Sequence, residues 1–175
     1  MLIYQDEVRP EWTDNNGHMR DAFYLLLFSL ATDALMDHIG LDHPATLPAP
    51  APRADASAAS SGAAGVARQG HSLFTLECHL HYLHEVKQGA QVEVHTRILT
   101  HDTKRLHLFS SLHLAGQEQE MAAAEQMQLH VDMAGPRACA FLPDVLDRVQ
   151  RFAAEDAAWP RSPRIGKLIG LPQRS

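Results

Sequence analysis

A chain of 175 residues with 45% hydrophobic and 21% charged residues is long enough for one globular domain with a sizeable core. Its formal net charge of −6 argues against a nucleic-acid surface as the main partner. The two cysteines, Cys78 and Cys139, suggest no disulfide framework, and the first residues lack the basic and apolar regions of a signal peptide. The sequence therefore predicts a cytoplasmic protein that neither binds nucleic acid nor enters a membrane.

A polar turn leads into a long apolar helix between residues 10 and 40. Asp21 is the expected N-cap, because its carboxylate can accept bonds from the first free N–H groups of the helix. Gly40 is expected to end the helix, since glycine adopts positive φ without strain. Apolar side chains cover most of the circumference, and Ser29, Asp33 and Asp37 leave only a narrow polar stripe. A helix this apolar is expected to be buried, with the turn at its N-terminus, where free N–H groups favour negative charge.

From residue 71 onward, apolar and polar residues alternate in four runs separated by short turns. The first run places Phe74, Leu76 and Leu80 on its dry face, and the last run places Gln126, Gln128 and His130 on its wet face. This pattern is typical of strands with one dry face, and the four runs predict an antiparallel meander. A short strand at residues 2–8 and an amphipathic helix at 143–158 complete the expected elements. The economical packing wraps the sheet around the buried helix, giving an α+β domain.

We expect a single domain over residues 1–158, with an Ala/Pro-rich loop insertion at 44–70 and a C-terminal tail at 159–175. The loop composition, dominated by Ala, Pro, Ser and Gly, offers too little apolar surface to offset the cost of ordering.

The turn and helix resemble those of the hotdog-fold acyl-CoA thioesterases of the 4-hydroxybenzoyl-CoA thioesterase superfamily. The turn of that family reads Asp-x-x-Gly-His-apolar-Asn-x-x-x-Tyr. In this sequence the pattern is filled by Asp14, Gly17, His18, Met19 and Tyr24. Arg20 stands where the family has the asparagine that helps to order the turn.

A more distant similarity is to plant acyl-ACP thioesterases, whose active turn reads Asp-x-Asn-x-His and whose second acid follows in Tyr-x-x-Glu. The matching residues are Asp14, Asn16 and His18, then Tyr82 and Glu85. The segments D-N-N-G-H-M, A-T-D-A-L and E-Q-M-x-L-H-V-D are most similar to thioesterases of carnitine breakdown that act on betainyl-CoA. These resemblances imply a hotdog fold, meaning an antiparallel sheet wrapped around one long central helix. They also imply a small acyl-CoA substrate, a homodimer or homotetramer with sites at the joint, and no cofactor beyond the coenzyme A of the substrate.

Thioester hydrolysis needs a water or carboxylate that attacks the carbonyl carbon, and donors for the developing oxyanion. Asp14 is the candidate general base or nucleophile, Asn16 can orient the water, and His18 can hold the turn or donate to the thioester. Glu85 is a candidate second acid, or alternatively a solvent-exposed carboxylate at a strand end. Backbone N–H groups between Asp21 and Phe23 can polarise the carbonyl.

The predicted substrate-binding residues are Gly17, Met19, Asp21, Ala22, Phe23, Tyr24 and Glu125. Glu125 shares the parity of the apolar positions of its strand, so we expect it to line the acyl pocket or to pair with an arginine across an interface.

Several alternatives stay open from the sequence. Asp14 and Asn16 can be ordinary turn residues that bond their own backbone, and Asp33 on the central helix is the runner-up catalytic acid. A hotdog enoyl-CoA hydratase resembles this chain less well, because its histidine follows the aspartate by five residues and a proline intervenes. A non-catalytic acyl-CoA binding module is the third reading. The H-L-H-Y-L-H segment at 79–84 offers histidines, but no Cys or acid completes a ligand set at the usual spacing, so no metal is expected.

Overall fold

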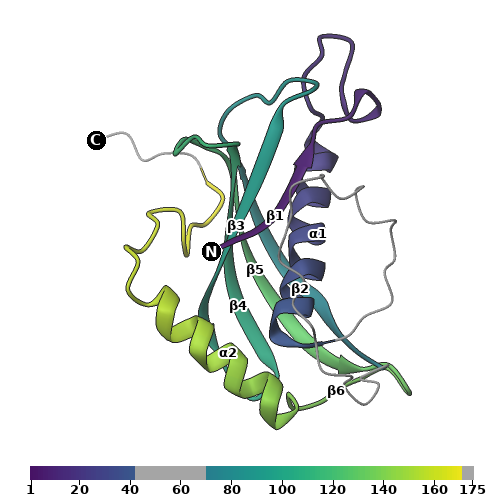
Figure 1. Cartoon of the computed structure of the whole chain (residues 1–175), viewed down its shortest axis with the longest axis vertical. Helices are drawn as coiled ribbons and strands as arrows, with labels where there is room; N and C mark the ends of the chain where they lie inside the picture. Colours follow the sequence, from purple (N-terminus) through teal and green to yellow (C-terminus); the bar gives the residue numbers. More distant parts are fainter. Residues whose placement is uncertain (42–69, 171–175) are drawn as a thin grey trace, which may run out of the picture.

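The computed structural model describes residues 1–41 and 70–170, so the predicted loop insertion at 44–70, apart from Gly70, lies outside the described residues, as does the end of the tail at 171–175. The described chain forms one six-stranded antiparallel sheet with two α-helices (Figure 1). The elements in chain order are β1 (Leu2–Glu7), the 3-10 helix η1 (Pro10–Trp12), α1 (Asp21–Ile39), β2 (His71–Tyr82), β3 (Gln91–His101), β4 (Arg105–Leu114), β5 (Glu120–Asp132), β6 (Arg137–Ala138) and α2 (Pro143–Asp156). The predicted α+β class, with a sheet wrapped around one long helix, is confirmed.

Helix α1 runs along one face of the curved sheet, and its buried side forms the centre of the core (Figure 1). Leu27 and Phe28 are fully buried there. The helix is long and apolar enough to cross a membrane, but in this fold it packs on the sheet. It ends at Gly40 as predicted, with φ of 77° in the left-handed region. Its start differs from the prediction, because Arg20 is the N-cap and Asp21 is the first helical residue.

The strand order across the sheet is β1-β3-β4-β5-β2. The predicted meander is therefore confirmed for β3, β4 and β5 but is wrong for β2, which pairs with β5 at the far edge. The connection at 83–90 carries the chain past two strands to reach β3. Alternation of polar and apolar residues predicts which face of a strand each side chain lies on, but not which strands pair. This crossover, residues 83–90, was therefore predicted to be a turn between neighbouring strands. Its consequence is that residues 83–90 and the polar turn lie together at one end of the molecule (Figure 1).

Strand β2 does not keep one dry face along its whole length. The prediction placed Phe74, Leu76 and Leu80 on the same face, but the register shifts between Thr75 and Glu77. An extra residue in one strand reverses the alternation beyond it. As a result Phe74 is 43% and Leu76 52% exposed, whereas Leu80 packs on the core around α1.

Strand β5 presents polar side chains to the interior. Gln126, Gln128 and His130 are at most 2% exposed, although the alternation had assigned them to the wet face. The Thr75 hydroxyl donates to Oε1 of Gln128 at 3.1 Å, which satisfies part of this buried polarity. The opposite face of β5 carries Ala123, which packs with Phe109 and Ile165 in a small second core. The dry and wet faces predicted for β5 are therefore reversed over much of the strand.

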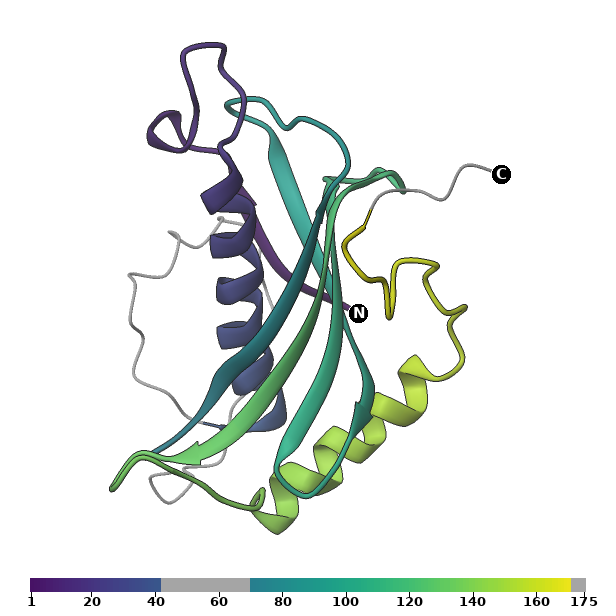
Figure 2. The same cartoon turned by 180° about the vertical axis from the view of Figure 1, so that it is seen from behind.

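The chain beyond α2 packs back onto the sheet. Helix α2 is amphipathic as predicted and buries Val145 and Val149 in the main core. The segment that follows lies on the side of the sheet opposite α1 (Figures 1 and 2). It is attached there by Arg164, whose Nε donates to Oε2 of Glu120 at 3.0 Å, and by the Gly166 N–H, which donates to Oε2 of Glu125 at 2.6 Å.

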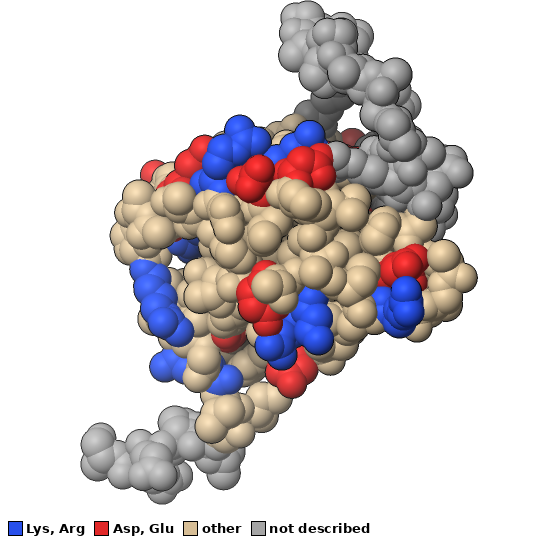
Figure 3. Space-filling view, turned by 90° about the horizontal axis from the view of Figure 1, so that it is seen from below, with Lys and Arg blue, Asp and Glu red and all other residues tan. Residues whose placement is uncertain are grey.

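Charged side chains of both signs are interspersed on the face shown in Figure 3, without one large patch of a single sign. Nucleic-acid-binding surfaces gather lysine and arginine in a stripe or patch. The mixed charges on this face and the net charge of −6 agree with the expectation that this protein binds no nucleic acid, which stays a prediction.

Candidate active site

Asp14 closes the polar turn that precedes α1. Its Oδ1 accepts the N–H of Asn16 at 2.8 Å and the N–H of His18 at 3.0 Å. Gly17 has φ of 75°, a conformation that favours glycine, so the turn requires this residue for its backbone. Asp14 therefore does bond its own turn, as one alternative proposed. Its second oxygen, Oδ2, makes no hydrogen bond to any described residue.

The surroundings of Asp14 favour its ionised form. The hydrogen bond from the His18 N–H holds the pKa of Asp14 below its ordinary value; partial desolvation opposes this effect, and the Asn16 N–H adds to it. The carboxylate is thus ionised at neutral pH, with Oδ1 held in the turn and Oδ2 available to a substrate or a water. A general base and a carboxylate nucleophile both require this state.

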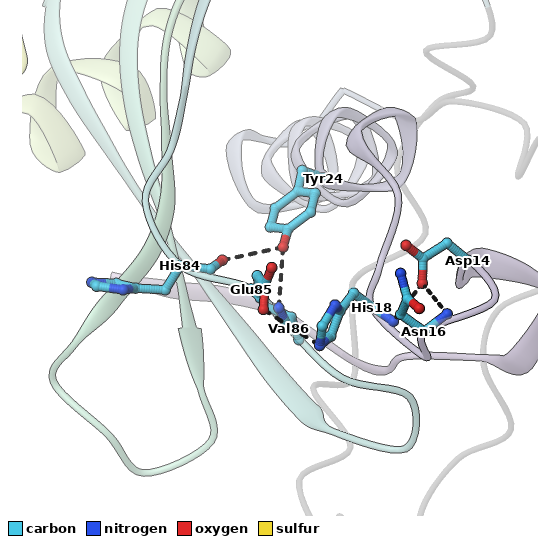
Figure 4. A network of polar contacts seen from close by, with 7 residues as sticks. All are labelled: Asp14, Asn16, His18, Tyr24, His84, Glu85 and Val86. Carbon is cyan, nitrogen blue, oxygen red and sulfur yellow. Dashed lines mark hydrogen bonds and ion pairs between the residues drawn. The ribbon is translucent and has the colours of Figure 1, made fainter.

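Tyr24 holds the crossover segment against the start of α1. Its hydroxyl donates to the carbonyl of His84 at 3.2 Å and accepts the N–H of Val86 at 3.2 Å (Figure 4). Tyr24 is only 4% exposed, so its hydroxyl replaces water as the partner of these backbone groups. The Met19 N–H also donates to the Val86 carbonyl, at 2.7 Å. Glu85 consequently stands beside the turn, although it lies more than sixty residues away in sequence.

His18 faces Glu85. Its Nε2 lies 3.4 Å from Oε2 of Glu85 (Figure 4), with the two side chains 27% and 74% exposed. A pair this exposed contributes little to stability, but it directs the imidazole away from the turn. His18 and Asp14 are joined through the backbone of His18, so the described contacts contain no Asp–His side-chain dyad.

An open cavity of about 690 Å³ lies between the turn, the start of α1 and the crossover. All four predicted catalytic residues line it, and so do four predicted binding residues: Asp14, Asn16, His18 and Glu85, with Met19, Asp21, Ala22 and Tyr24. Segments far apart in the sequence thus converge on one site.

Two backbone donors at the start of α1 are free for a ligand. The N–H groups of Asp21 and Ala22 make no hydrogen bond to any described residue, whereas the Phe23 N–H donates to the Arg20 carbonyl at 3.0 Å. The donor set is therefore narrower than the predicted range from Asp21 to Phe23. Free N–H groups at the positive end of a helix are suited to a developing oxyanion.

Three predicted binding residues lie outside this cavity. Gly17 shapes the turn without lining the cavity, and Phe23 stacks on Trp12 with ring centroids 5.6 Å apart. Glu125 lies on the sheet face opposite α1, where its Oε1 is 2.7 Å from Nε2 of His107 and its Oε2 accepts the Gly166 N–H. No arginine pairs with Glu125 among the described residues.

Four further residues line the cavity that the sequence had not placed in the site: Arg20, Tyr82, Leu83 and His84. Tyr82 had a signal, because it is the tyrosine of the Tyr-x-x-Glu motif. Leu83 and His84 follow from the same motif once the crossover is known, since they lie between its tyrosine and its acid.

One cluster of metal-ligating side chains occurs in the described part of the chain, at the other end of β2. The possible ligand atoms of His71, His130 and Cys139 all lie within 4.8 Å of one another. The two imidazole rings are stacked, with an interplanar angle of 11°. A histidine binds a metal in the plane of its ring, so one ring would have to turn before both could hold the same ion. The expectation that the protein needs no metal stays a prediction.

Comparison with known proteins identifies the group to which this geometry corresponds. The family model described as the thioesterase-like superfamily matches residues 8–149. The chain is 52% identical over 172 residues to a betainyl-CoA thioesterase of Pseudomonas aeruginosa, covering 98% of this chain and 96% of that protein. It is 36% identical to part of an L-carnitine dehydrogenase/betainyl-CoA thioesterase of Agrobacterium fabrum, covering 89% of this chain but only 28% of that longer protein.

A solved structure agrees with these sequence matches. The crystal structure of a candidate thioesterase from Pseudomonas putida KT2440 superposes with a TM-score of 0.76 at 43% identity, covering 99% of this chain and 97% of that one.

Proposed function

The chain belongs to the thioesterase-like superfamily and is an acyl-CoA thioesterase of the hotdog fold, and we propose that its substrate is betainyl-CoA. The observation that carries the proposal is the identity to a relative of that activity along nearly the whole chain. The site supports the proposal, because acids, aromatic rings and free N–H groups line one open cavity. A small charged acyl group would fit there, with the larger CoA moiety extending into solvent.

In the proposed reaction the thioester carbonyl oxygen accepts the N–H groups of Asp21 and Ala22. Oδ2 of Asp14 then either removes a proton from the attacking water or attacks the carbonyl carbon itself, forming an anhydride that water hydrolyses. Both routes break the carbon–sulfur bond and yield the free acid and coenzyme A. Asn16 is placed to orient the water, and Glu85 with His18 borders the same space. These groups supply the chemistry without a cofactor, and we place the reaction in the cytoplasm.

A thiol-release assay over a panel of acyl-CoA substrates tests the proposed substrate. Betainyl-CoA is expected to give the highest kcat/KM in the panel. A panel in which acetyl-CoA or a longer neutral acyl-CoA is preferred by tenfold or more would refute the proposed substrate. Release of no thiol from any member would instead contradict the assignment as a thioesterase.

The two chemical routes differ in where solvent oxygen first appears. In a single turnover with enzyme in excess and in H₂¹⁸O, the nucleophile route transfers ¹⁸O to the Asp14 carboxylate when water opens the anhydride at its aspartyl carbonyl. The general-base route places all of the label in the free acid. Detection of ¹⁸O in the peptide containing Asp14 by mass spectrometry would therefore demonstrate the nucleophile route.

We also propose that the protein acts as a homodimer joined through β2. This strand is twelve residues long and pairs with β5 on one side only, so its other edge is unpaired within the described chain. It exposes Phe74 and Leu76, and long apolar edges are templates for pairing with another chain. Two copies paired through β2 would form one continuous sheet.

Light scattering at micromolar concentration tests the dimer. The wild-type chain is expected to have at least twice the monomer mass of 19.4 kDa. Leu76→Asp places a charge on the proposed edge and should shift the protein toward monomer. Met133→Asp is the matched control, because Met133 is 42% exposed and follows β5 rather than lying on the β2 edge. A wild-type monomer, or equal effects of both substitutions, would contradict the proposal.

A further inference from the structure

The proposed substrate poses a specific recognition problem. A betainyl group carries a trimethylammonium one methylene away from the thioester carbon, so a bulky permanent cation sits next to the reacting centre. This cation has no N–H to donate, and proteins bind such groups with aromatic faces and carboxylates. Any site for it must therefore lie beside Asp14 and the start of α1, in the cavity already described.

Tyr82 has the position and the exposure that this role requires. It lines the cavity at the end of β2, and 51% of its surface is accessible, which is unusual for so large an aromatic residue. Its ring is held on two sides. The ring of Tyr24 meets the Tyr82 ring edge to face with ring centroids 5.4 Å apart, and the Tyr82 hydroxyl donates to the Asp21 carbonyl at 3.4 Å.

The charges around the cavity favour a cationic ligand. The carboxylates of Asp14, Asp21 and Glu85 line it, against the single guanidinium of Arg20. Burial, and after it the charge of Asp21, raises the pKa of the Tyr82 hydroxyl, so the phenol stays neutral and available for stacking. A neutral acyl group would gain nothing from this arrangement, whereas a trimethylammonium group gains from both the ring and the carboxylates.

We propose that Tyr82, supported by Tyr24 and by the carboxylate of Asp21, forms the binding site for the quaternary ammonium group of the acyl chain. Tyr82 is then the residue that selects a betainyl group over a neutral acyl group of the same shape. This inference rests on the proposed substrate. It adds a cation-recognition role to a residue that would otherwise be an exposed aromatic at the end of an edge strand.

The test compares betainyl-CoA with its neutral isostere, 3,3-dimethylbutanoyl-CoA, in which carbon replaces the quaternary nitrogen. Tyr82→Leu removes the aromatic face and should lower kcat/KM for betainyl-CoA by about 3- to 30-fold, the range expected for a cation–π contact. It should change kcat/KM for the isostere by less than about twofold. Tyr82→Phe keeps the ring and should retain the preference for the cation. Trp159→Leu removes a 65% exposed aromatic that lies after α2, outside the cavity lining and away from the proposed β2 interface, and is the matched control.

The outcomes distinguish this inference from the proposed function. Equal losses for both substrates in Tyr82→Leu would mean that the residue only supports the fold, and would overturn the inference while leaving the substrate intact. Wild-type kcat/KM values for both substrates in Tyr82→Leu would overturn the inference as well. A wild-type enzyme that turns over other acyl-CoAs but not betainyl-CoA would overturn the proposed substrate, and this inference with it.

Discussion

Replacing Asp14 by asparagine separates the two tasks that the structure gives to its carboxylate. Oδ1 accepts two N–H groups of the turn, from Asn16 and His18. Asp14 lines the cavity, and its Oδ2 has no hydrogen-bond partner among the described residues. An asparagine keeps a carbonyl oxygen that can accept the same two bonds. Its amide group can neither act as a base nor attack a thioester. The variant should therefore fold, bind acyl-CoA and lose turnover.

The size of the loss follows from the role of a single carboxylate. A positioned general base or acid contributes about 10²- to 10⁴-fold to the rate, which corresponds to about 2.7 to 5.4 kcal/mol of transition-state stabilisation. The two N–H donors of Asp21 and Ala22 remain in place, so the variant should still exceed the uncatalysed rate. Stability should change by less than about 1 kcal/mol, because the substituted side chain is near the surface and keeps its acceptor.

The assay is thiol release at saturating substrate, with the melting temperature and the Kd for betainyl-CoA measured on the same variants. Asp33→Asn is the matched control, since Asp33 is the alternative acid and lies on α1 outside the cavity lining. Asp33→Asn should reduce turnover by less than about threefold. Near-full turnover in Asp14→Asn, with loss of turnover in Asp33→Asn or in Glu85→Gln, would refute the assignment of Asp14.

The pH profile gives an independent check. Because the His18 N–H lowers the pKa of Asp14 from its ordinary value of 3.8, more than half of the carboxylate needed for either route is still ionised at that pH. Activity limited by Asp14 should persist through mildly acidic pH and fall only below about pH 4, as Asp14 takes up its proton. An acidic limb of kcat/KM near neutral pH in the wild type would contradict Asp14 as the limiting group.

Three further predictions concern residues around the site. Arg20→Asn restores the family residue of the turn and should leave turnover equal to or above the wild type; loss of activity would give Arg20 a role of its own, such as binding a phosphate of CoA. Tyr24→Phe leaves the buried Val86 N–H without its acceptor and should destabilise the fold by about 1 to 3 kcal/mol in denaturant melts, with lower kcat; an unchanged melt would show that Tyr24 does not hold the crossover. Glu125→Ala should free the C-terminal segment for limited proteolysis while kcat/KM stays within twofold; a large fall in kcat/KM would instead support the pocket role that the sequence suggested.

The attachment of the C-terminal segment through Glu125 also has a predictable pH dependence. Burial opposes ionisation of Glu125, but the Gly166 N–H and His107 outweigh it, so the pKa of Glu125 is lowered from its ordinary value of 4.5. A carboxyl with a lowered pKa stabilises the folded form above that ordinary value and loses this contribution as the pH falls through the lowered pKa. Proteolysis of the C-terminal segment should therefore increase below about pH 4.5 in the wild type and show no such step in Glu125→Ala.

Local patterns in the sequence were sufficient to predict most elements. The apolar run before Gly40 predicted α1, and the alternation from residue 91 to 114 predicted β3 and β4, because helix and strand periods are properties of neighbouring residues. The turn was found for a similar reason, since Asp14 and His18 bond within a few residues of each other. Patterns of this kind need no knowledge of which segments meet in space.

The parts that were missed depend on long-range contacts. The register shift near Leu76 reverses the faces of β2, and the sequence there shows only one more apolar residue in an alternating run. Glu125 was expected to line the pocket or to pair with an arginine across an interface, because it alternates in step with the apolar residues of β5. That alternation does not show that the C-terminal segment contacts this face of the strand. The partnership of the turn with Glu85 came from resemblance to a family motif and not from any local pattern.

The crossover explains why the site lies where it does. If β2 and β3 were paired as a hairpin, the segment at 83–90 would be a tight turn at the sheet edge, away from the start of α1. Because β3 pairs with β1 instead, this segment must pass the N-terminal end of α1, and Tyr24 satisfies its backbone there. The same path places Tyr82 before the crossover and Glu85 within it, both against the cavity of Asp14. Strand order therefore determines which side chains can meet at the thioester. A prediction with every strand correct but in a different order would place Glu85 away from the turn.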